Sequence, residues 1–546
     1  MNTIVDVLRE NKTKYPNDLA LIEFNPELEE KNEKSWKDFD LVEPSNKGEH
    51  RRTLTWDEFD KYSNRVANMF IKLGYKKGDK VAILLMNSLE WLPIYFGVLK
   101  AGLIAVPLNF RYTADEIEYC LDLSDASALV FGPEFTGRIE QLVGKAKGIK
   151  SALYLGYDCP SFADRLNTYL TFVNDSDPNI PLKEDDYAAI YFSSGTTGFP
   201  KAILHFHRAL YAACVTENKH HGQTKSDIFV CIPPLYHTGA KMHWFGSFLV
   251  GATSVLLRGT KPKWILKAIS QEKATICWLL VPWAQDILDS IENGSINLND
   301  YSLSQWRLMH IGAQPVPPSL VKRWKNIFSD HEYDTNYGLS ESTGPGCVHL
   351  GIENIHKVGA IGKAGYGWET KIVDSNRQEI KQGEVGELAV RGDGVMHCYY
   401  NDPKATDEIL DKDGWLYTGD MAQMDEDGFI YLVDRKKDVI ITGGENLYPV
   451  QIENFIRNNN KVKDVAVIGI PDERLGEIAL AIIELKENEN ATIEEINEFC
   501  LDLPRYKRPR KVVFDIIPRN PTGKIEKPKL REKYCGGRLV EMQTKE

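Results

Sequence analysis

A nine-residue run of small and polar residues, Ser-Ser-Gly-Thr-Thr-Gly-Phe-Pro-Lys at 193–201, is the stretch of this sequence best suited to chemistry. Backbone N–H groups in such a loop can point inward together and bind an oxyanion, while hydroxyls add donors and a lysine adds charge. A triphosphate is the ligand that best suits such a loop. The spacing G-x-x-G-x-P-K differs from the G-x-x-x-x-G-K-[ST] of a P-loop, which argues against an ordinary kinase or GTPase site. The alternative is a surface turn with no ligand.

The elements around this run determine where it would lie. It follows a buried strand predicted over 187–192 and precedes a helical pattern. From about 52 to 435, short apolar runs alternate with segments of helical period, which predicts α/β layers with largely parallel sheets. The predicted strands include 81–85, 228–232, 253–257 and 275–280, and the predicted helices include 263–272 and 318–328.

A different composition begins near residue 434, and the sequence predicts two domains, 1–434 and 435–546. The second is a small α+β domain, with a strand at 465–470 and a helix that starts at the capping box Thr492-Ile-Glu-Glu495. The charged run 434–438 indicates an exposed connector. Residues 25–50 are highly charged with few apolar anchors, which indicates a surface excursion.

Bulk composition excludes some functions. The chain has 546 residues, 42% of them hydrophobic, and a net charge of −12, which argues against a protein whose main task is to bind nucleic acid or an anionic membrane. Nine scattered cysteines without a CxxC pair suit reduced thiols in the cytoplasm. The N-terminus has no signal-peptide apolar region.

One apolar stretch, residues 91–110, is nearly long enough to be a membrane-spanning helix. Pro93, Lys100 and Pro107 interrupt it, so a buried helix followed by a core strand is the better interpretation. We therefore expect a cytoplasmic protein with no integral membrane segment and no nucleic-acid partner. A homo-oligomer is left open by the sequence.

The loop at 193–201 resembles the phosphate-binding signature of the adenylate-forming superfamily, which comprises acyl- and aryl-CoA synthetases, luciferases and peptide-synthetase adenylation domains. Further segments resemble that superfamily's other signatures and follow in its order: GAQP at 312–315, YGLSE at 337–341, TGD at 418–420, DRKKD at 434–438, GGEN at 443–446 and PRNPTGK at 518–524. The resemblance covers roughly 50–534. It implies a large AMP-binding domain of layered sheets and helices and a mobile C-terminal domain.

The resemblance implies an acid–thiol ligase with two half-reactions. A carboxylate first attacks the α-phosphate of ATP, which releases pyrophosphate and gives an acyl-adenylate. The thiol of coenzyme A then displaces AMP and gives a thioester. The implied substrate is a small carboxylic acid, fatty or aromatic, and the implied cofactors are ATP, Mg²⁺ and coenzyme A.

The resemblance also implies a role for individual residues. Lys524 would bridge the carboxylate and the phosphates, and Glu341 would coordinate Mg²⁺ with the Thr197 hydroxyl nearby. Asp420 would accept hydrogen bonds from the ribose hydroxyls, and Arg435 would contact ribose or phosphate. The phosphate loop would contribute Ser193, Ser194, Gly195, Thr196, Thr197, Gly198 and Lys201. The adenine and the α-phosphate would be bound by Gly312, Ala313, Gln314, Asn336, Tyr337, Gly338 and Ser340.

The second half-reaction requires a conformational change in this family. Lys437 stands where relatives have the hinge residue, whose torsion would exchange the face bearing Lys524 for one bearing Gly443 and Gly444. Those glycines would line the tunnel for the pantetheine arm. An ordinary helix-capping turn is the alternative interpretation.

The acyl pocket is the part that the sequence defines least. The segment 233–240 resembles the one whose His or aromatic residue gates the carboxylate site, so His237 would do so here. Thr238 follows it where peptide synthetases have an Asp, which disfavours an amino-acid substrate. Lys241 would pair with a second anionic group of the acid or extend to the surface. The complete predicted pocket is His237, Thr238, Lys241, Trp278, Val281 and Leu339.

Two other functions remain open from the sequence. One is an acyl-AMP ligase that loads a carrier protein, but the intact Gly443-Gly444 pair favours coenzyme A. The other is a non-catalytic nucleotide-binding protein with the same fold. The presence of Lys524 favours catalysis.

Overall fold

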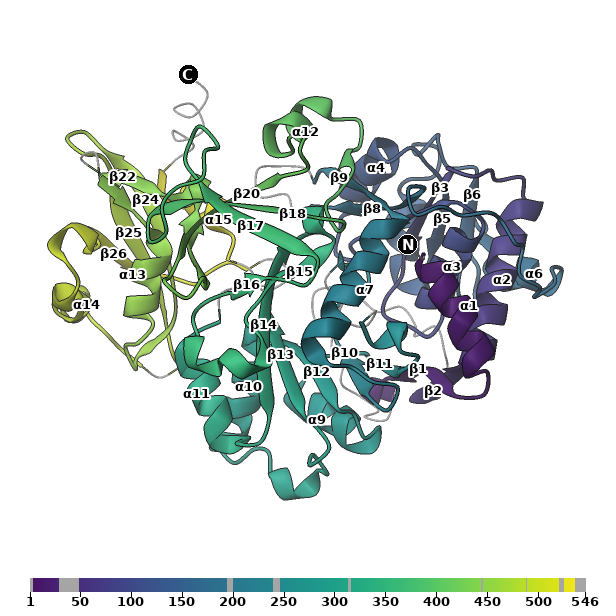
Figure 1. Cartoon of the computed structure of the whole chain (residues 1–546), viewed down its shortest axis with the longest axis horizontal. Helices are drawn as coiled ribbons and strands as arrows, with labels where there is room; N and C mark the ends of the chain where they lie inside the picture. The colour runs from purple at the N-terminus through teal and green to yellow at the C-terminus, as the bar shows by residue number, and fades with distance from the viewer. Residues whose placement is uncertain are drawn as a thin grey trace.

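The computed structural model describes residues 3–28, 49–193, 200–238, 246–312, 316–442, 445–487, 489–519 and 525–535. Two large sheets form its centre, a smaller antiparallel sheet adjoins them, and a fourth sheet forms the C-terminal end (Figure 1). Both large sheets are mainly parallel; the first has antiparallel strands at one edge and the second at both edges. This arrangement confirms the predicted α/β class.

The first large sheet has the strand order β19-β9-β8-β4-β3-β5-β6-β7 and is parallel from β8 to β7. Its outer strands β9 and β19 run antiparallel to their neighbours. The strands are β3 (Lys80–Leu84), β4 (Ile104–Pro107), β5 (Ala126–Phe131), β6 (Ser151–Tyr154), β7 (Asp164–Arg165), β8 (Tyr187–Phe192), β9 (Ala202–Phe206) and β19 (Cys398–Tyr399).

The second large sheet has the order β16-β15-β14-β13-β12-β10-β11-β1-β2 and is parallel from β14 to β1. The strands are β1 (Leu19–Phe24), β2 (Arg51–Thr55), β10 (Ile228–Cys231), β11 (Thr253–Leu257), β12 (Ile276–Leu280), β13 (Leu308–Gly312), β14 (Glu332–Leu339), β15 (Gly344–His349) and β16 (Lys363–Ala364). The predicted strands at 81–85, 187–192, 228–232, 253–257 and 275–280 are therefore confirmed in these two sheets.

Helices cover the sheets and fill the space between them. The helix most important for the site is α7 (His207–His221), which contacts β8 and β9 of one sheet and β15 of the other (Figure 1). Among the described helices before residue 434, three begin at a threonine capping box: α1 (Ile4–Lys14), α2 (Trp56–Lys72) and α4 (Ala114–Leu123). The others are α3 (Trp91–Lys100), α5 (Thr136–Glu140), α6 (Leu166–Thr171), α9 (Pro262–Gln271), α10 (Val281–Glu292), α11 (Pro318–Ile327) and α12 (Pro403–Ile409).

The apolar stretch 91–110 folds as predicted. Helix α3 is buried along its whole length, and the core strand β4 follows it. Within the described residues, no helix combines the length and apolar character that crossing a bilayer would require.

An antiparallel sheet occupies residues 368–435, where the sequence predicted continuing strand–helix alternation. It contains β17 (Trp368–Val373), β18 (Val385–Gly392), β20 (Leu416–Met424) and β21 (Ile430–Arg435). Most of the connections are too short for a parallel crossover, which needs a dozen or more residues. The prediction of parallel sheets is wrong for this part of the chain.

A fourth sheet and three helices form the C-terminal part, shown yellow-green in Figure 1. The predicted strand at 465–470 lies within β24, and the predicted capping box at Thr492 starts α14. The predicted division at 434/435 falls inside β21, one residue before its end at Arg435. The elements are β22 (Ile440–Thr442), β23 (Glu445–Leu447), α13 (Pro449–Ile456), β24 (Val462–Asp472), β25 (Gly476–Leu485), α14 (Ile493–Phe499), β26 (Lys511–Phe514) and α15 (Lys527–Cys535).

The charged run 434–438 is not the exposed connector that the sequence predicted. Asp434 and Asp438 are 5% and 8% exposed. Burial raises the pKa of Asp434 to about 6. Burial also disfavours the Asp438 carboxylate, but the charges of Lys527 and Arg531 outweigh it and lower the pKa. Positively charged side chains of α15 therefore accompany the burial of these two aspartates, whereas Lys436 between them is exposed.

Candidate active site

The ends of the predicted phosphate loop are held together by the hairpin that contains it. Strands β8 and β9 are antiparallel neighbours. The Ser193 N–H donates to the Lys201 carbonyl at 3.0 Å, and the Lys201 N–H donates to Ser193 Oγ at 2.9 Å. The loop therefore leaves and re-enters the sheet at one point. Five of its predicted phosphate-binding residues lie outside the described residues: Ser194, Gly195, Thr196, Thr197 and Gly198.

Lys201 and Glu341 are connected through Tyr399, which the sequence analysis did not identify. The Lys201 Nζ lies 4.7 Å from the centre of the Tyr399 ring, and the Tyr399 hydroxyl donates to Glu341 Oε1 at 2.7 Å. Burial, followed by the charge of Glu341, raises the pKa of Tyr399, so the phenol remains a donor. Tyr399 comes from β19, which pairs with β9. The chain segment 398–399 carries no motif that could have indicated this contact.

The YGLSE segment at 337–341 comprises the end of β14 and the start of the tight 3-10 turn, Ser340–Ser342, that leads into β15. A β-bulge lies between Tyr337 and Gly338, and Thr343 adopts a φ of 68° at the end of the turn. Bulges of this kind redirect side chains and occur often beside active sites. The turn leaves Ser340 and Glu341 half-buried.

His205 holds this turn against the first large sheet. Its Nε2–H donates to the Ser340 carbonyl at 2.9 Å. Burial lowers the pKa of His205 to about 4, so the ring is neutral at physiological pH. Because His205 belongs to β9, the phosphate loop and the YGLSE turn are fixed to the same strand.

Asp420, Tyr337 and Arg435 form a second cluster. Asp420 and Arg435 are directly opposed across β20 and β21, and Arg435 Nε lies 2.6 Å from Asp420 Oδ1. The Tyr337 hydroxyl donates to Asp420 Oδ2. Burial disfavours the guanidinium charge, but Asp420 raises the pKa of Arg435, and Glu341 contributes more weakly in the same direction. Arg435 therefore lies within electrostatic reach of both predicted site carboxylates.

Gly312 and Asn336 are close neighbours, as their shared assignment to the adenine site predicts. A Cβ on Gly312 would lie only 3.2 Å from Asn336 Oδ1 and 3.5 Å from Trp278 Nε1, which leaves little room for a side chain. Asn336 is buried, and its Nδ2–H donates to Glu217 Oε1 at 2.8 Å. Ala313 and Gln314 lie outside the described residues.

The predicted acyl-pocket residues are not all brought together. His237 is half-buried against the Tyr236 ring, 4.6 Å between centres, and Thr238 is buried beside it. Trp278 packs in the core that includes α7, whereas Val281 packs in the separate core with α9 to α11.

Leu339, also assigned to the pocket, packs against a third core, formed mainly by the antiparallel sheet. Lys241 lies outside the described residues.

The predicted hinge lies in a short 3-10 helix over Lys436–Asp438. Lys437 is half-buried, and burial lowers its pKa. The residues Thr442 and Glu445 are partners in β22 and β23. Gly443, Gly444 and the predicted catalytic Lys524 lie outside the described residues.

These elements assemble a polar site of the composition that a nucleotide requires. Lys201 and Arg435 supply positive charge, Asp420 supplies acceptors for hydroxyl groups, and Glu341 supplies a hard oxygen ligand. Glu341 uses Oε1 to accept from Tyr399, and among the described residues Oε2 accepts no hydrogen bond. The carboxylate therefore fits the coordination of Mg²⁺.

Comparison with known proteins gives matches along most of the chain. Residues 13–400 match the AMP-binding enzyme family, and residues 451–524 match the AMP-binding enzyme C-terminal domain. The chain is 34% identical over 478 residues to the long-chain-fatty-acid–CoA ligase FadD13 of Mycobacterium tuberculosis, covering 86% of this chain and 91% of that protein. It is 31% identical over 474 residues to a feruloyl-CoA synthase of an Amycolatopsis species, covering 86% and 92%.

A solved structure shows the same similarity in three dimensions. The anthranilate CoA ligase AuaEII, in complex with anthranoyl-AMP, superposes with a TM-score of 0.85 over 98% of both chains, at 25% sequence identity. The similarity includes both the large sheets and the C-terminal part.

Proposed function

The chain belongs to the AMP-binding enzyme family, and from that premise we propose how its residues perform ligation. It is an AMP-forming acid–thiol ligase that acts on fatty or aromatic acids. The proposal assigns the residues that bind ATP and the metal ion, and the residue that acts as the hinge. The joining of Tyr337, Asp420 and Arg435 from three separated segments is the observation that supports it best.

In the first half-reaction, the acid's carboxylate oxygen bonds to the α-phosphorus of ATP as the bond to pyrophosphate breaks. Negative charge gathers around the phosphorus, so positioned cations and donors stabilise the transition state. We assign Lys201 to the β- and γ-phosphates together with the loop 193–201. Lys524 would neutralise both the carboxylate and the phosphates. The Ser340 hydroxyl would donate a hydrogen bond to the α-phosphate.

Glu341 would hold Mg²⁺, with the Thr197 hydroxyl nearby. The ion, when bound, neutralises phosphate oxygens and orients the leaving pyrophosphate. Tyr399 is a positioning residue here, because its hydroxyl fixes Glu341 Oε1 and leaves Oε2 available. The Lys201 ammonium group lies over the same tyrosine ring.

Asp420 would bind the ribose. Its Oδ2 already accepts a hydrogen bond from Tyr337, and its Oδ1 forms an ion pair with Arg435. A carboxylate has about four acceptor sites, so each oxygen can still accept from a ribose hydroxyl. The two protein partners hold the carboxylate in place before ATP arrives, which lowers the entropic cost of binding.

In the second half-reaction, the coenzyme A sulfur bonds to the acyl carbon as the bond to AMP breaks. Rotation at Lys437 would withdraw Lys524 and bring Gly443 and Gly444 to the site. His237 would close the carboxylate site in one state and open it in the other. The side chain beside it, Thr238, offers no carboxylate to an α-amino group, which agrees with a fatty or aromatic acid.

A panel of fatty, aryl and alicyclic acids tests this function. We expect pyrophosphate release with ATP and at least one fatty or aromatic acid, and thioester formation when coenzyme A is added. Adenylation without a thioester on coenzyme A would favour the loading of a carrier protein. Nucleotide binding without pyrophosphate release from any acid would contradict the proposal and indicate a non-catalytic binding protein.

A further inference from the structure

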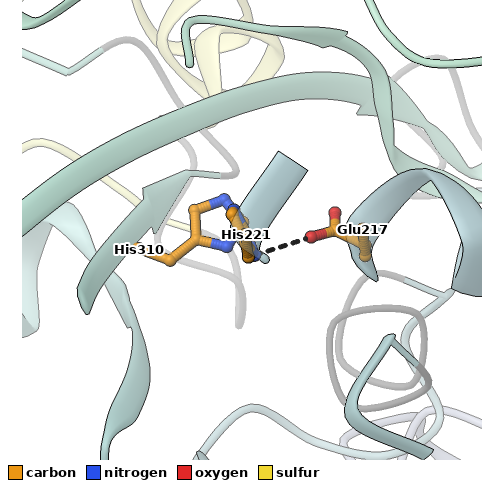
Figure 2. Close-up of side chains that lie close together, drawn as sticks. All are labelled: Glu217, His221 and His310. Atoms are coloured by element: carbon orange, nitrogen blue, oxygen red, sulfur yellow. Dashed lines mark ion pairs between the residues drawn. The ribbon is translucent and has the colours of Figure 1, made fainter. Parts of the chain in front are cut away.

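Helix α7 carries a glutamate and a histidine one turn apart that the proposed reaction does not use. Glu217 and His221 lie on the same helical face, and both side chains are fully buried. His310 of β13 is also fully buried and lies beside them. Figure 2 shows the Glu217 carboxylate directed toward the two imidazole rings. One ligand atom from each of the three residues lies within 4.8 Å of the other two.

The spacing of these atoms is close to that of a tetrahedral metal site. His221 Nδ1 and Glu217 Oε2 are 3.2 Å apart. Zinc ligands about 2.0–2.1 Å from the ion are separated by about 3.3 Å, so this pair needs almost no movement. The His221 and His310 ring centres are 4.5 Å apart. A shift of at most about 1.5 Å would complete the site with His310.

Neighbouring groups hold the two α7 side chains by the atoms that face away from this site. The Nε2–H of His221 donates to Asp334 Oδ2 at 2.8 Å, and the Gly351 N–H donates to Asp334 Oδ1 at 2.9 Å. Asn336 Nδ2–H donates to Glu217 Oε1 at 2.8 Å. A metal-bound histidine typically donates its second N–H to a carboxylate in this way.

The buried charge also favours a cation. Glu217 and Asp334 place two carboxylates where water is excluded, which is costly without compensating positive charge. The nearby Arg307 contacts the His221 backbone carbonyl and forms its ion pairs with other acids, Asp227 and Glu332. It therefore makes no ion pair with either buried carboxylate among the described residues.

His349 adds a second, independent indication. Its Nδ1 lies 3.2 Å from Asp334 Oδ2. Its buried Nε2 points toward Glu217, 3.9 Å from Oε1, and has no hydrogen-bond partner among the described residues. His349 therefore places a further potential metal-ligating nitrogen close to the Glu217 carboxylate.

We propose that Glu217, His221 and His310 bind a zinc-class divalent cation, with Asp334, Asn336 and His349 as supporting residues. Two imidazoles and one carboxylate suit zinc and related first-row ions rather than magnesium. A set of three protein ligands leaves a fourth position for water or a polar ligand group. This site is separate from the proposed magnesium site at Glu341, and it goes beyond the ligase reaction.

Metal analysis of the full-length protein tests the site directly. Purified protein is exposed to ZnCl₂ or CoCl₂ and dialysed against metal-free buffer. We expect one equivalent of zinc per chain, and for cobalt the visible absorption of a tetrahedral site. Glu217→Gln and His310→Ala should each lose at least nine-tenths of the bound metal, and Asp334→Asn should weaken binding 10- to 100-fold. His207→Gln, at a buried histidine outside the cluster, should retain the full equivalent.

A ligand replacement guards against variants that fail to fold. His310→Cys keeps a zinc ligand, so it should still bind one cobalt ion and add a thiolate-to-cobalt charge-transfer band in the near ultraviolet. His349→Gln should keep the metal, because His349 is a supporting residue. Folded wild-type protein with less than a tenth of an equivalent would overturn the proposal in favour of a protonated His221 bridging the two acids. Unchanged metal content in folded Glu217→Gln and His310→Ala would equally overturn it.

Discussion

Asp420 illustrates how a single carboxylate is prepared for its ligand. Its backbone N–H donates to the Thr418 hydroxyl at 3.1 Å, its Oδ2 accepts from Tyr337, and its Oδ1 forms an ion pair with Arg435. The side chain is almost fully buried, so these partners stabilise its charge. A neutral amide would keep the shape but lose the charge-assisted hydrogen bonds.

We therefore expect Asp420→Asn to raise the KM for ATP by 10- to 100-fold, which corresponds to the roughly 1.5–3 kcal/mol of a hydrogen bond to a charged group. Initial rates of pyrophosphate–ATP exchange at varied ATP give this value. Asp413→Asn, at an exposed turn just before β20, should have the wild-type KM. An unchanged KM in Asp420→Asn would exclude Asp420 from the ribose site.

Tyr399 provides a second test at the level of one side chain. Tyr399→Phe removes the hydroxyl that orients Glu341 but retains the ring beneath Lys201. We expect the Mg²⁺ concentration for half-maximal adenylation to rise about tenfold, because Glu341 must then be ordered by the ion itself. Tyr400→Phe is a matched control, since its hydroxyl donates to the exposed Asp125. Equal Mg²⁺ dependence in both variants would contradict the positioning role.

Sequence motifs predicted Glu341, Asp420 and Arg435 but not Tyr399. The first three belong to ordered motifs, whereas Tyr399 reaches the site because a two-residue strand joins the edge of a sheet. Such edge pairing depends on tertiary packing and leaves no periodic signal. Val281, which the sequence analysis places in the acyl pocket with Trp278, is the first residue of α10. Trp278 of β12 packs in one core and Val281 packs in another, because the chain changes from strand to helix between them.

At the level of elements, α15 is tied to the hinge region by buried charges. Lys527 Nζ lies 2.8 Å from Glu453 Oε1, and burial of the lysine is outweighed by Glu453, Asp434 and Asp438, which raise its pKa. Lys527 therefore stabilises three acids that would otherwise repel one another. Its partners come from β21, the 3-10 helix after it and α13.

We predict that Lys527→Ala lowers the free energy of unfolding of the C-terminal part by about 3 kcal/mol, because it leaves buried carboxylates unpaired. Urea denaturation monitored by circular dichroism measures this change. Lys529→Ala, two residues away, removes an exposed pair with Glu526 and should cost less than about 0.5 kcal/mol. Similar losses in both variants would show that the buried network contributes little.

Element types were largely predictable because apolar period and capping residues are local. The strands of the two large sheets and the capping box at Thr492 follow from such signals. The antiparallel sheet of 368–435 was missed, since strand direction depends on which neighbour a strand finds. The burial of Asp434 and Asp438 was missed for a related reason: their counter-charges, Lys527 and Arg531, lie about 90 residues further along the chain.

At the level of the whole molecule, buried histidines link stability to pH. Burial lowers the pKa of His205, His207, His220 and His331 to about 4 in each case. In the unfolded chain an imidazole binds its proton near pH 6.5, so the unfolded state binds more protons between these values. The contribution of these neutral histidines to the free energy of unfolding is fully present above about pH 6.5 and is lost as the pH falls toward 4.

The free energy of unfolding should therefore decline between pH 7.5 and pH 5, by about 2 kcal/mol for each such histidine. Urea titrations at several pH values measure the decline. His207→Gln should be about 2 kcal/mol less sensitive to this change than the wild type, because it removes one of the four groups. Identical pH dependence in the variant would mean that His207 is not buried in its neutral form.

The central claim is that two parts of the chain divide the two half-reactions, with Lys524 serving only the first. The most direct measurement compares pyrophosphate–ATP exchange with thioester formation from supplied acyl-adenylate and coenzyme A, in wild type and Lys524→Ala. The account predicts that the variant loses exchange by at least 100-fold but forms thioester at close to the wild-type rate, with Lys529→Ala normal in both assays. Exchange at the wild-type rate in Lys524→Ala would contradict it.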